Sequence, residues 1–203
     1  YIDNLLEAKK VLVTQIGGTL LTVAKDVKLQ IEFNPAVVKS YRLIGYENRL
    51  LAAEDFDDDT KDAGELGAGH SVTALYELVM AEGADTSGEL RYTDTTIKEG
   101  AAASGEVMYI KFRYKKPDGD TSLLIEEPVP FASTAPGQTS ENYRFASAVA
   151  EFGLLLRDSD YKGNASHDDC IARAESAMGG DMYGYREEFV SLVKKAKALS
   201  GKQ

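Results

Sequence analysis

Hydrophobic and polar residues alternate along the first two thirds of the chain, which is the pattern that predicts β-strands. From residue 27 to residue 34 every second side chain is hydrophobic, and Pro35 ends the run. The same period of two recurs over residues 70–80 and 107–115. A strand over residues 121–129 follows a segment with the composition of a tight turn and is predicted to pair with the strand before it.

Two stretches between these strands are less regular. Residues 37–51 are too long and mixed for one flat strand, so a bulge or bend is expected at Gly45. Residues 82–105 are rich in small and polar residues and predict a long loop with one short strand near residues 90–92.

Helical periodicity is found at both ends of the chain. Residues 4–16 carry hydrophobic side chains three and four positions apart, which predicts an amphipathic helix ended by Gly17 and Gly18. After the small-residue linker at 131–138, three hydrophobic stripes predict three helices. Ser166 to Asp169 matches a capping box at the start of the second. The residues of the three stripes are Phe145, Ala148, Val149, Phe152, Leu155 and Leu156; Ile171, Ala174, Ala177 and Met178; and Phe189, Leu192, Val193, Ala196 and Leu199.

These elements predict an α+β protein. No helix-sized pattern separates the strands, so a parallel sheet is disfavoured and an antiparallel β-sandwich over residues 25–130 is expected. A helical subdomain over residues 138–203 follows it. The helix within residues 1–24 either packs on the sheet or is the end of a preceding domain.

Composition and charge exclude several classes of function. The 203 residues are 43% hydrophobic and carry a net charge of −10, so the chain can form a core but is a poor ligand for nucleic acid or anionic membranes. One cysteine, Cys170, allows no internal disulfide. No hydrophobic run approaches the length of a membrane-spanning helix. The chain starts at Tyr1, without Met and without a signal-peptide pattern, and we expect it to be a fragment.

The strongest local signal is the acidic segment Glu54–Glu65, in which seven of twelve residues are acidic and only Lys61 opposes them. A calcium loop of the EF-hand type needs glycine at position 6 and glutamate at position 12. Counted from Asp55, these positions hold Thr60 and Leu66. A non-standard divalent site built on Asp55, Asp57 and Asp59 is an alternative. We favour a solvated or partner-facing loop, whose contact residues would be Asp57, Asp58, Asp59 and Asp62.

Other chemistry-bearing residues have simpler structural explanations. His70 is expected to be a structural hydrogen-bonding residue at the start of a strand. His167 and Cys170 lie three apart on a predicted helix, but two ligands do not make a zinc site, and no oxyanion hole accompanies them. The glycines within 64–69 and 100–105 lack the Gly-Lys-Ser/Thr ending of a phosphate-binding loop and are typical of turns.

Four stretches carry a resemblance to a known family. DVKLQIEFNP (26–35), YRLIGYENR (41–49), EDFDDDTKDAGELGAGHSVTALYEL (54–78) and YREEFVSLVKKAKAL (185–199) resemble the C-terminal region of bacterial von Willebrand factor type A domain-containing proteins. That region is a domain of unknown function, and the resemblance covers nearly the whole chain. It implies that residues 1–24 are the terminal helix of a truncated type A domain.

The resemblance also implies where metal chemistry belongs. Type A domains bind a divalent cation through an Asp-x-Ser-x-Ser motif, and the nearest match here, Asp85 to Glu89, ends in Glu and lies in a predicted loop. We therefore expect no catalytic residue and no cofactor in this chain, with the cation in the missing type A domain. The implied location is the bacterial cell envelope or periplasm, with a lipid anchor on the missing N-terminal part as a further expectation.

The sequence thus favours a non-catalytic binding or scaffold module. It would contact its own type A domain and a protein partner, without nucleic-acid binding or membrane insertion. The alternative is a metal-dependent hydrolase that uses the acidic segment together with His70.

Overall fold

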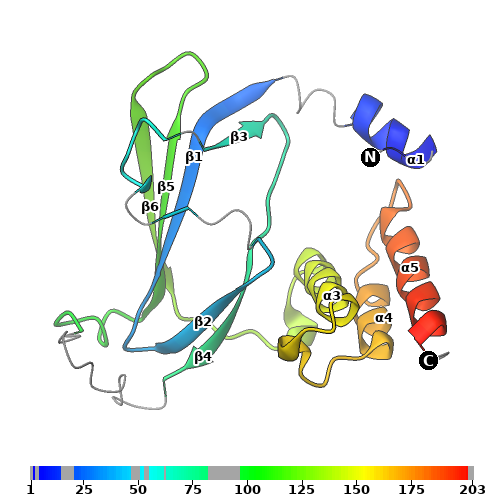
Figure 1. Ribbon diagram of the computed structural model, residues 1–203. Coiled ribbons are helices and arrows are strands. Elements are labelled where there is room, and N and C mark those ends of the chain that lie inside the picture. The colour runs from blue at the N-terminus through cyan, green and yellow to red at the C-terminus, as the bar shows by residue number, and fades with distance from the viewer. Residues whose placement is uncertain are drawn as a thin grey trace. The chain divides into compact units, whose positions relative to one another are not determined.

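A computed structural model describes residues 2, 5–14, 21–46, 51–52, 55–61, 63–81 and 97–200 (Figure 1). The short strand predicted near residues 90–92 and the motif from Asp85 to Glu89 lie outside the described residues. The chain divides into two compact units, which we describe separately. The first contains Tyr1–Arg42, Tyr46–Val72 and Tyr76–Phe131, and the second contains Leu43–Gly45, Thr73–Leu75 and Ala132–Gln203.

The first unit is built on a four-stranded antiparallel sheet with the order β3-β1-β5-β6. Its strands are β1 (Thr22–Phe33), β3 (Gly64–Gly67), β5 (Glu106–Lys115) and β6 (Ser122–Pro130). A two-stranded sheet joins β2 (Val38–Ile44) to β4 (Leu75–Met80). The predicted α+β class, with antiparallel pairing and C-terminal helices, is confirmed, while the sandwich arrangement stays a prediction.

The core of this unit lies where the two sheets meet. Phe33, Val38 and Val107 are buried, and their partly buried neighbours include side chains of β4. The ring of Phe33 lies 4.4 Å from that of Tyr41 and 5.3 Å from that of Tyr76, measured between centroids. The alternation predicted for residues 76–80 is therefore confirmed, because Tyr76, Leu78 and Met80 all pack against this cluster.

Alternation over residues 27–34 predicts that the hydrophobic face of β1 is buried and its polar face exposed. Near the middle of the strand this prediction is wrong. Leu29 is 50% exposed, whereas its neighbour Lys28 is only 4% exposed. A register shift between Lys25 and Lys28, with a positive φ of 53° at Asp26, bends the strand there. The polar face is covered because the acidic segment packs on it.

Several strand boundaries also differ from the prediction. β4 begins at Leu75, so residues 70–74 precede the strand and Val72 is 70% exposed. β2 ends at Ile44, before Gly45, whose φ of +80° supplies the predicted bend. Gly64–Gly67, interpreted above as turn chemistry, instead forms β3 on the edge of β1.

The hairpin of β5 and β6 matches its prediction closely. The strands pair in continuous register from Lys115 and Ser122 to Met108 and Val129. In the turn between them, the Gly119 amide donates to the Lys116 carbonyl at 3.0 Å.

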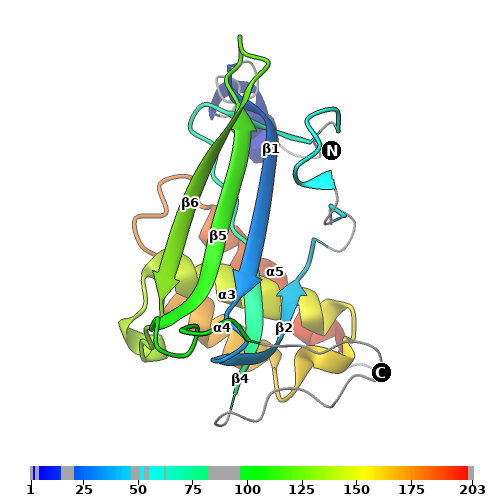
Figure 2. The same ribbon diagram turned by 90° about the vertical axis from the view of Figure 1, so that its left-hand side faces the viewer.

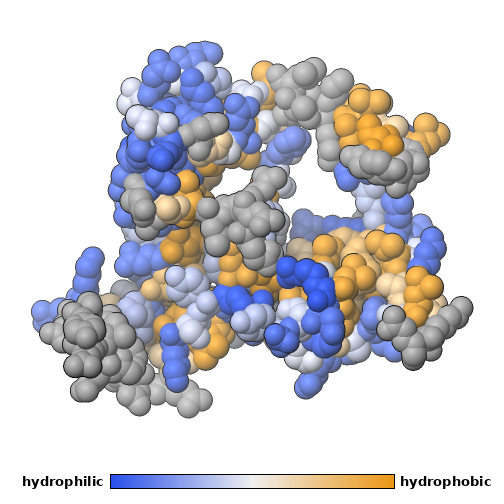
Figure 3. Space-filling model, viewed as in Figure 1, coloured by the Kyte–Doolittle hydropathy of each residue, from blue (hydrophilic) through white to orange (hydrophobic). Residues whose placement is uncertain are grey.

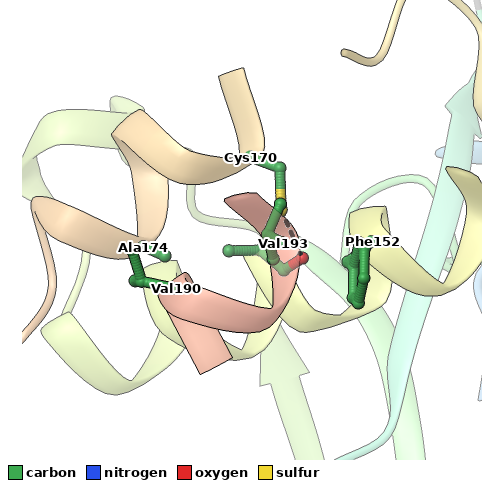
Figure 4. Close-up of a cluster of buried hydrophobic side chains, with 6 residues drawn as sticks. Phe152, Cys170, Ala174, Val190 and Val193 are labelled. Carbon is green, nitrogen blue, oxygen red and sulfur yellow. Dashed lines mark hydrogen bonds between the residues drawn. The ribbon is translucent and has the colours of Figure 1, made fainter. Parts of the chain in front are cut away.

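The second unit contains three α-helices, as predicted: α3 (Glu141–Leu156), α4 (His167–Glu175) and α5 (Tyr185–Ser200). Two 3-10 turns, η4 (Pro136–Gln138) and η5 (Asp160–Lys162), lie in the connections. The Ser166 hydroxyl caps α4 by accepting from the Asp169 amide at 3.1 Å. The three helices share one core, shown in Figure 4, of Ala148, Phe152, Cys170, Ala174, Val190 and Val193.

The hydrophobic stripes of these helices are wider than the core requires. Val149 and Leu156 on α3 are 44% and 62% exposed, and Leu192 and Leu199 on α5 are 52% and 68% exposed. These four residues belong to the stripes that predicted the helices, but they lie at the exposed margin of the stripes. Figure 3 shows hydrophobic residues, in orange, on the visible surface of the helical unit.

The N-terminal helix is short and exposed. Its α-helical part, α1 (Leu5–Lys9), continues as a π-helical turn, η1 (Lys10–Thr14). Leu5 is 87% exposed and Leu12 58%, so this stripe is not covered by the sheet. Its origin in a type A domain stays a prediction. Within the described ranges, no helix combines the length and the apolar character needed to cross a membrane.

Candidate functional site

The acidic segment lies against the polar face of the main sheet, beside β5 and β6 (Figure 1, cyan trace). The aromatic residue of the segment, Phe56, is only 4% exposed, so its buried side chain helps to fix the segment in place. Three cations of the sheet meet it: Lys28 from β1, and Arg113 and Lys115 from β5. Lys28 and Arg113 are register partners, so their side chains share one face.

Lys28 holds the main chain of the segment. Its ammonium donates to the Asp55 carbonyl at 2.9 Å and also to the Asp58 carbonyl. Because a buried charge is costly without partners, these two carbonyls are what allow the side chain to be covered. The same contacts satisfy two carbonyls of a loop that has little secondary structure of its own.

Arg113 holds the side chains of the segment. Its Nη1 lies 3.1 Å from Asp57 Oδ1, and its Nη2 lies 3.0 Å from Asp59 Oδ1. The Asp59 carboxylate also accepts from the Ser122 hydroxyl on β6. One guanidinium thus bridges two carboxylates that would otherwise repel each other.

Lys115 joins the segment to the bend in β1. Its ammonium donates to Asp26 Oδ2 at 2.8 Å and to the Asp59 carbonyl at 3.0 Å. Within the segment, Asp58 accepts from the amide and hydroxyl of Thr60 at 2.9 and 2.7 Å, which forms a local turn. Residues 55–61 of the acidic segment therefore have a defined conformation on the sheet.

These contacts lower the pKa of three carboxyl groups. The hydrogen bond from Lys115 lowers the pKa of Asp26, and the hydrogen bonds from Thr60 lower that of Asp58. Hydrogen bonds from Ser122 and Arg113 lower the pKa of Asp59. The pKa of Lys115 is raised by its hydrogen bond to Asp26. Each of these shifts favours the charged form of the group.

We expect the chain to lose stability in acid. The three aspartates have folded pKa values below their unfolded value of about 4, so their contribution is complete above that pH and is lost as the pH falls through the folded values. The free energy of unfolding, measured with urea, should fall between about pH 5 and pH 2. In Asp59→Asn part of this fall should disappear, whereas Asp118→Asn in the exposed hairpin turn should keep it all.

The three carboxylates of the alternative metal site, Asp55, Asp57 and Asp59, each lie beside a cationic side chain. Asp57 and Asp59 contact Arg113, and Asp55 lies 3.7 Å from Lys61. In the described part of the chain, no group of three or more acidic, His or Cys side chains is arranged to hold a metal ion. Of the predicted contact residues, Asp57, Asp58 and Asp59 come together in the segment, and Asp62 lies outside the described residues.

The histidines and the cysteine occupy separate places. His70 is exposed and precedes β4 by several residues, so its predicted place at a strand start was wrong. His167 begins α4, with its ring 6.4 Å from that of Phe152. Cys170 is fully buried, its Sγ lies 3.2 Å from the Ala148 carbonyl (dashed in Figure 4), and burial raises its pKa to about 11. At neutral pH this thiol is protonated and therefore a poor nucleophile.

A pocket of about 590 Å³ lies further along the same polar face. Tyr109, Lys111 and Glu126 line it, and Asn34 closes one side by donating to the carbonyls of Ala101 and Glu106, both at 2.8 Å. Burial is the main cause that raises the pKa of Tyr109, and the negative charge of the neighbouring Glu126 raises it further. This pocket could not be predicted from the sequence, because its lining comes from three strands and a distant loop.

The cations under the acidic segment were not predicted from the sequence. The alternation over residues 27–34 puts Lys28 on the polar side of its strand, and the period of two over residues 107–115 does not identify Arg113 or Lys115 as contacts of the segment. A signal was present, since Arg113 and Lys115 are two apart and so share a face, and a strongly acidic loop occurs in the same chain.

Comparisons with known proteins place the chain in a family. The family model described as "Uncharacterized protein YfbK, C-terminal" matches residues 18–199. The curated protein "Uncharacterized protein YfbK" of Escherichia coli (strain K12) is 43% identical over 200 residues, which are 98% of this chain and 34% of that protein. The chain therefore spans about a third of the length of the curated relative it matches. No solved structure gives a significant match. The chain belongs to the family of the YfbK C-terminal region.

Proposed function

We propose that the chain is a non-catalytic binding or scaffold module that accompanies a von Willebrand factor type A domain in a bacterial envelope adhesion or assembly protein. The resemblance of four of its stretches to the C-terminal region of such proteins supports this proposal. The length of the YfbK relative agrees with it, because about two thirds of that protein lie outside the match and leave room for further domains.

The observation that carries the proposal is the fixed conformation of the acidic segment. Asp57 keeps 84% of its side chain exposed although its carboxylate contacts Arg113, and Asp59 keeps 47%. A charged loop that is already ordered loses little conformational entropy when a partner binds. The segment therefore offers a preorganised negative surface that suits a basic protein surface. The other domains of the same polypeptide, above all its type A domain, are the first partners to consider.

The chemistry of the described residues supports binding in preference to catalysis. Asp57 and Asp59 of the segment are engaged with Arg113 of the sheet, and the thiol of Cys170 is buried and protonated. The envelope location and the lipid anchor are proposed on the resemblance alone. A divalent cation would be held by the type A domain and not by this chain.

We expect the type A domain of the same polypeptide, produced separately, to bind this chain in a salt-dependent manner. Surface charges contribute about 0.5 kcal/mol each, so the double substitution Asp57→Asn with Asp58→Asn should weaken binding about fivefold. Isothermal titration calorimetry at low and high salt measures both effects. The matched control is Glu187→Gln with Glu188→Gln on α5, which removes the same charge from two exposed residues elsewhere.

Two results would contradict the proposal. If the type A domain does not bind the chain at low salt, the chain does not support that domain. If the α5 control weakens binding as much as the double substitution in the segment, overall charge is responsible and the segment is not the contact surface.

A further inference from the structure

The pocket on the polar face of the main sheet is large enough for a small-molecule ligand. Its volume of about 590 Å³ falls within the range of about 300–1,000 Å³ that is usual for such sites. Three strands, β1, β5 and β6, supply residues to its lining and run side by side (Figure 2). All of the lining residues belong to the first compact unit, so the pocket is formed within that unit.

Hydrogen bonds fix one wall of this pocket. Besides donating to the carbonyls of Ala101 and Glu106, the Asn34 side chain accepts from the Ala36 amide at 3.0 Å. The Ser104 hydroxyl donates to the Ala101 carbonyl at 2.9 Å and accepts from the Glu106 amide at 3.1 Å. The wall is therefore in place before a ligand arrives, and little conformational entropy has to be lost on binding.

Charged groups of both signs share the pocket. Glu32 on β1 is the register partner of Tyr109 on β5, and Lys111 on β5 is the register partner of Glu126 on β6. Register partners lie on the same face of a sheet, and so do alternate residues of one strand. These four side chains therefore form one patch, which contains two carboxylates, one ammonium group and one hydroxyl group.

The ammonium group of Lys111 is not paired with the carboxylates around it. Glu126 lies directly across from it, a position in which opposite charges usually attract each other. In the described part of the chain, however, neither Lys111 nor Glu32 forms an ion pair or a hydrogen bond through its side chain. Glu126 lies instead beside the hydroxyl group of Tyr109. One ammonium group and one carboxylate are thus available to a ligand in the same pocket.

We propose that the pocket binds a zwitterion of about dipeptide size, with its carboxylate beside Lys111 and its ammonium group beside Glu32. These two residues are diagonal neighbours on adjacent strands, and the Cβ atoms of such neighbours are about 7–8 Å apart. A single amino acid holds both of its charged groups on one carbon atom. A dipeptide holds them about 3.5 Å further apart, which suits the diagonal spacing better.

Ligands with a single charge suit the pocket less well. An anion would face the three carboxylates of the lining, and a cation would face its two ammonium groups. These residues are Glu32, Glu106 and Glu126, and Lys98 and Lys111. Covering either sign without a partner is costly, whereas a zwitterion presents a partner to both signs. This inference goes beyond the proposed function and does not depend on it, because no type A domain takes part in the binding.

Titration of the full chain with alanylalanine, followed by nuclear magnetic resonance of isotope-labelled backbone amides, tests the class of ligand. We expect saturable shifts of the amide signals of Ala101, Tyr109 and Lys111. The matched ligands are N-acetyl-alanylalanine, which lacks the ammonium group, and alanylalanine amide, which lacks the carboxylate. Each should bind about tenfold more weakly than alanylalanine, because one charge-assisted contact is lost.

Two substitutions test the place of binding. Lys111→Gln and Glu32→Gln should each weaken the binding of alanylalanine about tenfold. Their controls are Lys116→Gln, beside the exposed hairpin turn, and Glu127→Gln, on the other face of β6, and neither should change the affinity. The amide spectrum of each variant also reports whether it is folded. The proposal is overturned if no saturable shift occurs, if a blocked peptide binds as tightly as alanylalanine, or if the site variants bind no more weakly than their controls.

Discussion

Replacing Phe152 by alanine is expected to destabilise the helical unit by about 3–5 kcal/mol, the usual cost of deleting a buried aromatic side chain. Phe152 is only 5% exposed, and its ring meets that of Phe189 at 5.6 Å between centroids in an edge-to-face arrangement. Removing it leaves a cavity between α3 and α5 that the remaining side chains cannot fill without moving. Urea unfolding followed by far-ultraviolet circular dichroism measures the loss.

The same helix provides the control for this substitution. Leu156 lies four residues after Phe152 and is 62% exposed, so Leu156→Ala should change the free energy of unfolding by less than about 0.5 kcal/mol. If the two substitutions cost the same, the core assigned to the three helices is wrong.

Replacing Lys28 by methionine is expected to cost about 2–4 kcal/mol and to release the acidic segment. Methionine fills a similar volume but leaves the carbonyls of Asp55 and Asp58 without their donor, and each unsatisfied carbonyl costs about 1–3 kcal/mol. Urea unfolding measures the loss of stability. Hydrogen exchange of residues 55–61 measures the release of the segment, since local opening raises the exchange rate.

Lys39 on β2 is the matched control, because it is an exposed lysine within a strand. Lys39→Met should leave both stability and exchange nearly unchanged. Protection of residues 55–61 that survives in Lys28→Met would show that Phe56 and Arg113 hold the segment without the lysine.

Elements with a local signal could be predicted from the sequence. The three C-terminal helices follow from their periodicity and, for α4, from the capping residue Ser166, because a helix is stabilised by neighbours a few positions away. The hairpin of β5 and β6 follows from alternation on both sides of a recognisable turn. The helical stripes include residues that do not reach the core. Periodicity alone cannot show that a residue at the margin of a stripe, such as Leu156, remains exposed.

Features that depend on distant residues could not be predicted. Alternation places Lys28 toward solvent, and only the segment 27 to 30 residues later covers it. β3 has no periodic pattern, because Gly64–Gly67 becomes a strand only through the edge of β1. For the candidate site the acidic half was evident from composition. The cationic half comes from two strands. The spacing of Arg113 and Lys115 puts them on one face, but nothing local in the strands shows that the acidic segment covers that face.

Because Lys28 binds main-chain carbonyls, the side chains of the acidic segment can vary without loss of this contact. A carbonyl is present whichever side chain a residue carries, so the anchor tolerates change at Asp55 and Asp58. Relatives could therefore alter the chemistry displayed by this loop while keeping its course over the sheet. For the same reason, the loop is a suitable position for displaying randomised sequences in an engineered library.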